Sequence, residues 1–290
     1  MKIGIGLPNP VNGYQQYPGT RLVEWAQRAE ERGFSGLATI DRVAYPSYDS
    51  LTALAAAAGT TSRIGLLTNI LLGPVYPSAL LARTAASLDQ ISGGRFTLGI
   101  APGGRADDYA AVGADFETRG KDFDGQLHVL HKLWRAEPLA DGGPAVTPTP
   151  VNGGRVPVMI GGGGKAAIRR AVAWADGFTI GGAPPQMVGP VFDGVRAAWK
   201  EAGRDGEPRL AALTYFSLGG EAEADSRGYL KHYYAFLGEY AGMIADGALR
   251  TPEAIQGAVK AYADAGATEL YLDPTTCDLD QLDRLADVVL

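Results

Sequence analysis

Short apolar runs alternate with longer amphipathic segments from one end of the chain to the other. The apolar runs predict strands at residues 3–7, 37–40, 64–70, 96–100, 156–160, 178–180, 210–216 and 270–272. Apolar residues three and four apart predict helices at 20–32, 50–58, 78–90, 121–134, 166–174, 188–202 and 279–289, with a long helical stretch from about 227 to 265. The chain thus consists of eight strand-then-helix units.

Repeated units of this kind indicate a parallel sheet covered by helices. Eight of them follow one another with no linker and no change in composition, which favours a single α/β domain over residues 1–290. We predict a (β/α)₈ barrel of the TIM type, with insertions after the fourth and seventh strands. An open, doubly wound sheet is the alternative.

In such barrels the chemistry takes place at the carboxyl ends of the strands. The pattern therefore selects the residues that directly follow each predicted strand. These are Pro8, Asn9, Asp41, Arg42, Thr68, Asn69, Ile70, Pro102, Gly103, Gly104, Arg105, the segment from Gly161 to Lys165, Gly181, Gly182, Tyr215, Phe216 and Asp273.

Four consecutive glycines stand out in this set. Gly161, Gly162, Gly163 and Gly164 lie between a predicted strand and a helix that opens with Lys165. Glycines let backbone N–H groups approach an anion, and the N-terminus of a helix favours negative charge. A bound phosphate is therefore one explanation of the four glycines, and a tight turn that packs the helix on the strand is the other.

The common nucleotide-binding motifs do not fit this segment. A P-loop needs glycine at position 159 and a hydroxyl at 166, where the chain has Met159 and Ala166. A dinucleotide fingerprint fits the glycine spacing, but the acidic residue expected about 20 positions later is missing. If a phosphate binds, we expect Arg169 or the lysine to add charge, and Gly181 and Gly182 to complete the cup.

Composition and charge limit the classes of molecule that the protein is expected to bind. The net charge of −6 argues against nucleic acids and anionic membranes, which attract basic surfaces. No apolar run is long enough to span a bilayer, and the N-terminal residues lack the features of a signal peptide. His128 and His131 lie three apart with no third ligand nearby, so we expect no metal. These features are typical of a soluble, cytoplasmic protein.

A specific pattern runs through the centre of the chain. It consists of the third predicted strand, a helix led by a proline, a Leu-Asp pair, a Ser-x-Gly-Arg turn and a Phe-x-Leu-Gly strand, at Pro77, Leu88, Asp89, Ser92, Gly94, Arg95, Phe96, Leu98 and Gly99. This pattern resembles the luciferase-like family of flavin-dependent oxidoreductases. Weaker matches at residues 29–34, 119–134, 175–177 and 265–272 extend the resemblance over essentially the whole chain.

The resemblance implies a barrel that binds a flavin, either FMN or the 5-deazaflavin coenzyme, at its mouth. It also implies a non-proline cis peptide at Asn69–Ile70 and a homodimer. The ring would lie against strands three and four, with the phosphate at the glycines. The implied cofactor-binding residues are Thr68, Asn69, Ile70, Pro102, Gly103, Gly104, Gly161, Gly162, Gly163, Gly164, Lys165, Gly181 and Gly182.

The chain departs from the family at one position. Many members carry an acidic residue followed by histidine after strand two, where this chain has Asp41 and Arg42. An arginine cannot act as a general base at neutral pH. It could bind an anionic substrate group or an anionic reduced flavin, or it could form a surface ion pair with Asp41 or Asp49. We take Asp41, Arg42 and Asn69 as the candidate catalytic residues, and this departure argues against luciferase-type aldehyde chemistry.

Aromatic residues near the mouth suggest a small organic substrate. The candidates are Tyr14, Tyr45, Tyr215 and Phe216. A second aromatic segment around His232 follows strand seven, and it predicts either a lid or ordinary packing.

The expected function is oxidoreduction with a flavin. Reduced FMN with O₂, in a monooxygenase, is the first choice, and a separate reductase could supply the reduced FMN. Hydride transfer with the 5-deazaflavin coenzyme is the alternative, since both cofactors need an anion cup. A flavin-binding barrel without turnover is a further alternative. A phosphosugar enzyme would need a lysine or paired carboxylates at strand ends, where only isolated Asp41 and Asp273 occur.

Overall fold

The computed structural model describes residues 1–9, 17–146 and 148–290. Among these residues, parallel strands form one sheet in the order β3-β2-β1-β9-β8-β7-β6-β5-β4, and an additional pairing of β3 with β5 closes it into a barrel. The strands are β1 (Lys2–Gly6), β2 (Gly36–Thr39), β3 (Gly65–Thr68), β4 (Leu71–Leu72), β5 (Phe96–Ala101), β6 (Val158–Gly161), β7 (Gly177–Gly181), β8 (Arg209–Phe216) and β9 (Glu269–Pro274). Because β3 and β4 are two pieces of the third strand, the predicted eight-stranded barrel is confirmed, and the doubly wound alternative is excluded.

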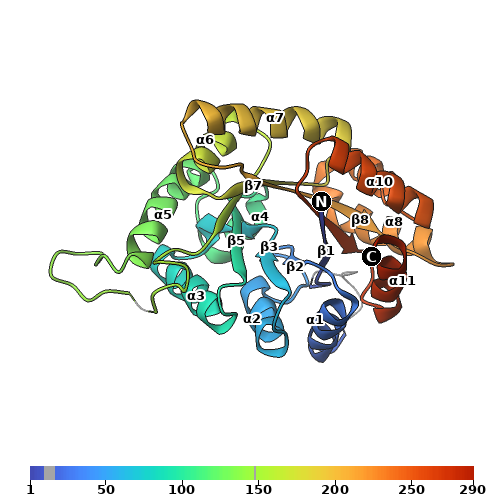
Figure 1. The fold of residues 1–290 in the computed structure, drawn as a ribbon, viewed down its shortest axis with the longest axis horizontal. Helices are drawn as coiled ribbons and strands as arrows, with labels where there is room; N and C mark the ends of the chain where they lie inside the picture. The colour runs from blue at the N-terminus through green and yellow to red at the C-terminus, as the bar shows by residue number, and fades with distance from the viewer. Residues whose placement is uncertain (10–16, 147) are drawn as a thin grey trace.

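Helices surround this barrel as a ring (Figure 1). They are α1 (Thr20–Arg32), α2 (Ser50–Thr60), α3 (Ser78–Ile91), α4 (Ala106–Val112), α5 (Arg119–Trp134), α6 (Lys165–Trp174), α7 (Pro185–Glu201), α8 (Ala222–Tyr233), α9 (Tyr240–Asp246), α10 (Pro252–Asp264) and α11 (Leu279–Val289), with short 3₁₀ turns η1 (Gly73–Val75) and η2 (Ala235–Leu237). Helix α1 illustrates how the sequence sets these elements. Its buried face consists of Leu22, Trp25, Ala26 and Ala29, and Gly33, with a φ of 96°, ends the helix.

The two predicted insertions are present. After β5 the chain forms α4 before the expected helix α5, and α4 is absent from the sequence-based prediction. After β8, the stretch predicted as one long helix is instead divided into α8, η2, α9 and α10. The physical causes are local: Gly238 takes a φ of 58°, and Thr251 caps a new helix that starts with Pro252.

The barrel interior is filled in layers. At its amino end, Arg209 and Glu269 form a bidentate ion pair at 2.7 and 3.0 Å. A layer of Ala38, Leu67, Met159, Ala211 and Tyr271 follows above it. These two layers fill the lower barrel, which leaves its upper part, at the carboxyl ends of the strands, for a ligand.

Candidate active site

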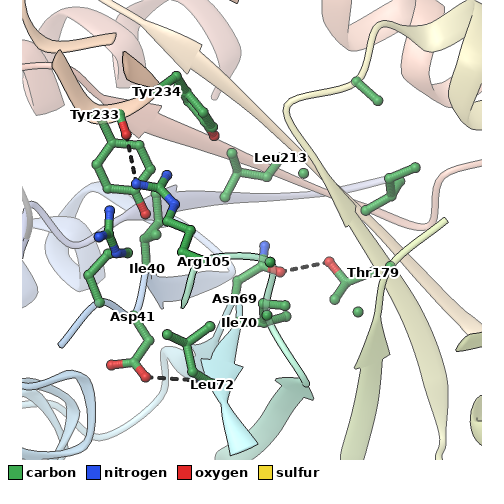
Figure 2. A pocket seen from close by; sticks show the side chains of 18 of the residues that line it. Ile40, Asp41, Asn69, Ile70, Leu72, Arg105, Thr179, Leu213, Tyr233 and Tyr234 are labelled. Carbon is green, nitrogen blue, oxygen red and sulfur yellow. Dashed lines mark hydrogen bonds between the residues drawn. The ribbon is translucent and has the colours of Figure 1, made fainter. Parts of the chain in front are cut away.

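A cavity of about 460 Å³ opens at the carboxyl ends of the strands. Its walls come from the ends of most barrel strands, and part of its roof comes from α8 and η2 (Figure 2). Of the residues singled out in the sequence, those that line this cavity are Asp41, Arg42, Asn69, Ile70, Gly103, Gly104, Arg105, Gly161, Gly162, Gly163, Gly181 and Tyr215. The structure thus brings together residues that lie up to 174 positions apart, from Asp41 to Tyr215.

Asn69 sits where the third strand is interrupted. The peptide bond between Asn69 and Ile70 is cis, as the family resemblance implied. The Asn69 side chain is buried, and its Oδ1 accepts a hydrogen bond of 2.7 Å from the Thr179 hydroxyl (Figure 2). Its Nδ2 is buried without a hydrogen-bond partner among the described residues. A buried donor of this kind is costly unless a ligand accepts from it.

The glycine segment forms a cradle beside Asn69. Gly162 has a φ of 137°, which side-chain-bearing residues rarely adopt. A Cβ on Gly161 would come within 2.8 Å of the Ile70 side chain, whereas Gly164 has open space around it. Gly164 is also the N-cap of α6 and supplies no side-chain cap, so the first N–H groups of that helix are left to other partners. The unpartnered Asn69 amide and this cradle fit a flat heterocycle that carries a phosphate.

The two basic side chains that were expected to add charge at the cradle lie outside the cavity lining. Lys165 is exposed and does not line the cavity. The Arg169 side chain is 3.3 Å from Asp124 of α5, which is also bound by Arg170 at 2.7 Å. Neither side chain therefore lines the cradle, and Arg169 is engaged with α5.

Arg42 is not paired as the sequence suggested. The surface pair with Asp41 or Asp49, one of the alternatives drawn from the sequence, is wrong: the Arg42 Nε donates to Asp108 at 2.7 Å, and its Nη2 donates to Asp107 at 2.8 Å. The Asp108 side chain has no exposed surface and also accepts from the backbone N–H groups of residues 43 and 44, at 2.8 and 2.7 Å. Arg42 therefore fixes the β2 loop to α4, and two carboxylates offset its charge.

Asp41 has a structural position at the cavity wall. Its carboxylate accepts hydrogen bonds from the Leu72 N–H and the Ser50 hydroxyl, both at 3.0 Å, and from the Tyr76 hydroxyl at 3.3 Å. Burial raises the pKa of Asp41 to about 6, even though these donors favour the charged form. Asp41 thus holds β4 in place beside the interrupted strand.

This raised pKa predicts a pH dependence of stability. Unfolded Asp41 has a pKa of 3.8 and folded Asp41 one of about 6, so between these values the folded state binds more protons. The free energy of unfolding should therefore fall by about 3 kcal/mol in total as pH rises through both pKa values, with about 2 kcal/mol of this fall between pH 4 and 6, at about 1.4 kcal/mol per pKa unit. In Asp41→Asn this fall should be absent. Denaturant unfolding at several pH values measures it, and equal slopes in both proteins would refute the prediction.

Arg105 holds the roof of the cavity. In the sequence it was one of the residues that follow a predicted strand, and no role was predicted for it. Its Nη1 donates to the Tyr233 carbonyl at 2.7 Å (Figure 2). Its guanidinium lies 4.4 Å from the Tyr233 ring centroid and 4.0 Å from that of Phe236. Cation–π contacts of this kind fasten the segment after β8 to the loop after β5. The part of the prediction that expected a lid here is consistent with this arrangement.

The residues predicted to bind the substrate do not share one cavity. Tyr215 lines the cavity and shares a hydrogen bond of 2.7 Å with the Tyr234 hydroxyl. Tyr45 lies in a neighbouring surface hollow, where its hydroxyl is 2.8 Å from His232 Nδ1. Phe216 is fully buried in the main hydrophobic core and does not line the cavity, because alternate strand residues point to opposite faces. Tyr14 lies outside the described residues.

Three other sequence candidates lie outside the cavity lining. The Thr68 hydroxyl donates to the Gly99 carbonyl at 2.7 Å, and the Pro102 carbonyl accepts from the Tyr109 hydroxyl. Gly182 lines a second, apolar hollow. The three therefore shape the mouth without lining the cavity.

Asp273, at the end of β9, is buried with its Oδ1 unpartnered among the described residues. Burial raises the pKa of this carboxyl well above its usual range. Burial at the end of β9 therefore disfavours the charged form of this carboxyl.

The remaining chemistry-bearing residues do not add a site. The His128 and His131 rings pack against Trp174, with centroids 5.9 and 5.2 Å away, and burial lowers the pKa of His131 to about 4. Within the described part of the chain, no cluster of three or more potential metal ligands occurs. None of the described helices combines the length and the apolar character needed to cross a bilayer.

Comparison with known proteins agrees with this architecture. The family model described as luciferase-like monooxygenase matches residues 1–275. An uncharacterised protein of Mycobacterium tuberculosis is 27% identical over 238 residues, which cover 72% of this chain and 82% of that protein. An F420-dependent glucose-6-phosphate dehydrogenase of Nakamurella multipartita is 28% identical over 220 residues, covering 68% of this chain and 64% of that enzyme.

Solved structures share the whole fold. An F420-dependent secondary alcohol dehydrogenase superimposes with a TM-score of 0.79 at 20% identity, covering 100% of this chain and 98% of that one. The oxygenating constituent of 3,6-diketocamphane monooxygenase from Pseudomonas putida, in complex with FMN, gives 0.78 at 16% identity and covers 99% and 96%. The chain thus belongs to the luciferase-like family of flavin- and F420-dependent oxidoreductases.

Proposed function

We propose that the protein is an oxidoreductase that transfers a hydride between a 5-deazaflavin coenzyme and a small organic substrate. One observation carries the proposal: an unpartnered buried amide, Asn69 Nδ2, lies in the same cavity as the glycine cradle. The amide would donate to a polar atom of the ring, and the cradle would hold the phosphate at the N-terminus of α6. Both features are typical of a site for a phosphate-bearing heterocycle.

The choice of the deazaflavin reverses the preference drawn from the sequence. The Nakamurella relative is named an F420-dependent dehydrogenase, and F420 is the 5-deazaflavin coenzyme. A second relative, 27% identical over 210 residues, is a 5,10-methylenetetrahydromethanopterin reductase from Methanolobus tindarius. Both names describe hydride chemistry, and these two relatives support the deazaflavin. The solved structures favour neither class, because the F420-dependent enzymes are 19–20% identical to this chain and the monooxygenases, among them RslO1 from Streptomyces bottropensis, are 16–20% identical.

The protein's own contribution would be position and electrostatics. The coenzyme supplies the hydride, whereas Asn69 orients the ring, Ile70 supports it, and Arg105 keeps the roof over the substrate. The ionisable groups Asp41, Arg42 and Asp108 of the described lining are all hydrogen-bonded or ion-paired within the protein. The reaction is therefore one that needs no strong base from this lining.

Reduced FMN with O₂, in a monooxygenase, is the second candidate. The observation in its favour is again that Asp41, Arg42 and Asp108 are hydrogen-bonded or ion-paired within the protein. Oxygen chemistry on a flavin also needs little acid–base catalysis from the protein. Apolar side chains of Ile40, Leu72 and Leu213 in the cavity wall would exclude water from it.

An anaerobic assay tests the proposed function. Reduced 5-deazaflavin would be incubated with the protein and a panel of small ketones, enones and imines, and its reoxidation followed by absorbance. We expect reoxidation with one chemical class and none without protein. Turnover only with reduced FMN under air would favour the second candidate. Binding of the deazaflavin without any turnover would favour a flavin-binding barrel.

The proposed position of the phosphate can be tested by substitutions of Gly164. This N-cap has extended φ and ψ of −103° and 167° and open space around its Cα, so aspartate and asparagine both fit. Either should cap α6 and raise the free energy of unfolding by a few tenths of a kcal/mol relative to glycine.

Only the aspartate should harm the cofactor site. Its charge would repel the phosphate, so we expect Gly164→Asp to weaken deazaflavin binding about tenfold and Gly164→Asn to change it less than twofold. Thermal unfolding and fluorescence titration of the three proteins measure both effects. Equal deazaflavin affinity in the aspartate and asparagine variants would show that the phosphate does not bind at this cradle.

A further inference from the structure

A second hollow lies directly behind the cofactor cavity, and it is almost free of polar groups. It encloses about 520 Å³ between the start of α7, the end of β8, α9 and α10. We call it the apolar groove and define it by Met187, Leu237, Met243, Ile244, Leu249 and Ala258. None of the described residues that line it is charged.

The two buried tyrosine hydroxyls beside the groove are engaged within the protein. The Tyr262 hydroxyl donates to the Ala183 carbonyl at 2.7 Å, and the Tyr215 hydroxyl is bonded to that of Tyr234. An occupant would therefore find apolar carbon and sulfur atoms and few hydrogen-bonding groups. Methionine side chains, here Met187 and Met243, adapt to the shape of an apolar ligand.

The groove adjoins the cofactor cavity. Ala183 and Tyr215 line both spaces, and the hydrogen-bonded pair of Tyr215 and Tyr234 lies between them. The Tyr215 side chain is therefore what a molecule that reacts at the cofactor would have to pass to reach the groove. This adjacency points to a part of the substrate as the occupant.

We propose that the apolar groove binds the hydrocarbon portion of the substrate, an alkyl chain or alicyclic ring, while its reactive group faces the cofactor cavity. This assignment rests on the proposed function for what happens at the reactive group. The binding of hydrocarbon itself follows from the groove alone.

Displacement of a neutral fluorescent probe, N-phenyl-1-naphthylamine, by the n-alkanols from butanol to decanol tests the proposal. Burial of each methylene should tighten alkanol binding about fourfold until the groove is filled. In deazaflavin-loaded protein, saturating alkanol should leave the coenzyme bound, because the two spaces are adjacent but separate. An affinity that is independent of chain length, or displacement of the coenzyme by the alkanol, would overturn the proposal.

Two variants with matched controls locate the binding. Ala258→Phe fills the groove from α10 and should weaken octanol binding at least tenfold, whereas Ala254→Phe places the same ring on an exposed position of that helix and should not. Met243→Glu adds a charge at a side chain that is 67% exposed, so it should fold normally and weaken binding about tenfold. Ile91→Glu, 59% exposed at the end of α3, is its control.

The outcomes separate this proposal from the proposed function. Unchanged octanol affinity in both groove variants overturns it, as does gel filtration in which Met243→Glu converts a dimer to a monomer. The latter result would make the groove an interface between copies. If octanol binds as expected but the deazaflavin does not, the cofactor assignment fails while the hydrocarbon site stands.

Discussion

Replacing Asn69 with leucine is expected to weaken deazaflavin binding about 100-fold. The substitution removes the one buried side-chain amide with a free donor among the described residues of the cavity, and it leaves a polar atom of the ring without its partner. Loss of a buried hydrogen bond with an unpaired group left behind costs up to about 3 kcal/mol, which corresponds to this factor. Fluorescence titration of the coenzyme measures it.

Stability should change much less. Removing Asn69 Nδ2 relieves a buried donor that has no partner within the described protein, whereas removing Oδ1 leaves the buried Thr179 hydroxyl unpaired. The two effects oppose each other, so the free energy of unfolding should change by less than about 1 kcal/mol. Thr179→Val serves as the graded control: it removes only the hydroxyl that orients the amide, at 2.7 Å, and should weaken binding about fivefold. An Asn69→Leu protein that binds the coenzyme like the wild type would rule out the amide as a cofactor ligand.

Replacing Arg42 with methionine should produce the largest loss of stability, about 3–5 kcal/mol. The change leaves the Asp108 carboxylate, whose side chain has no exposed surface, without the guanidinium that pairs with it at 2.7 Å. Removing one partner of a buried ion pair costs more than the pair contributes, because the remaining charge stays desolvated. Urea unfolding of the wild type and the variant measures the loss.

A double variant isolates the pair. Asp108→Asn on top of Arg42→Met removes the isolated charge and should recover about half of the lost stability. Asp107, whose side chain is 57% exposed, is the matched control, and Asp107→Asn should cost less than about 1 kcal/mol. If Arg42→Met were as mild as Asp107→Asn, the buried clamp between β2 and α4 would not be a major source of stability.

Much of the architecture follows from the apolar pattern. The bounds of α1 and α11 match the prediction, and each predicted strand exists with ends shifted by a few residues, because buried parallel strands are continuous apolar runs. The position of the site followed from the barrel itself, since the ends of the strands must meet at one face.

The parts that were missed depend on contacts across the chain. α4 has only seven residues, too few for a helical period to show, so Asp108 could not be recognised as the partner of Arg42 66 positions away. The role of Arg105 depends on aromatic rings of α8 and η2, which no local pattern connects to it. The misplacement of Phe216, in contrast, could have been avoided from the sequence. Successive residues of a strand point to opposite faces, so Phe216 and the inward-facing Tyr215 cannot both line the cavity.

The central claim is that the cavity between Asn69 and the glycine cradle binds a flavin-type cofactor, with the 5-deazaflavin preferred. Fluorescence titration of the purified protein with the deazaflavin coenzyme and with FMN, each oxidised and reduced, tests it most directly. The account predicts saturable binding of the deazaflavin at one site per chain, at least tenfold tighter than FMN, and lost in Asn69→Leu. Binding of neither cofactor would contradict the account and leave the four glycines as a turn.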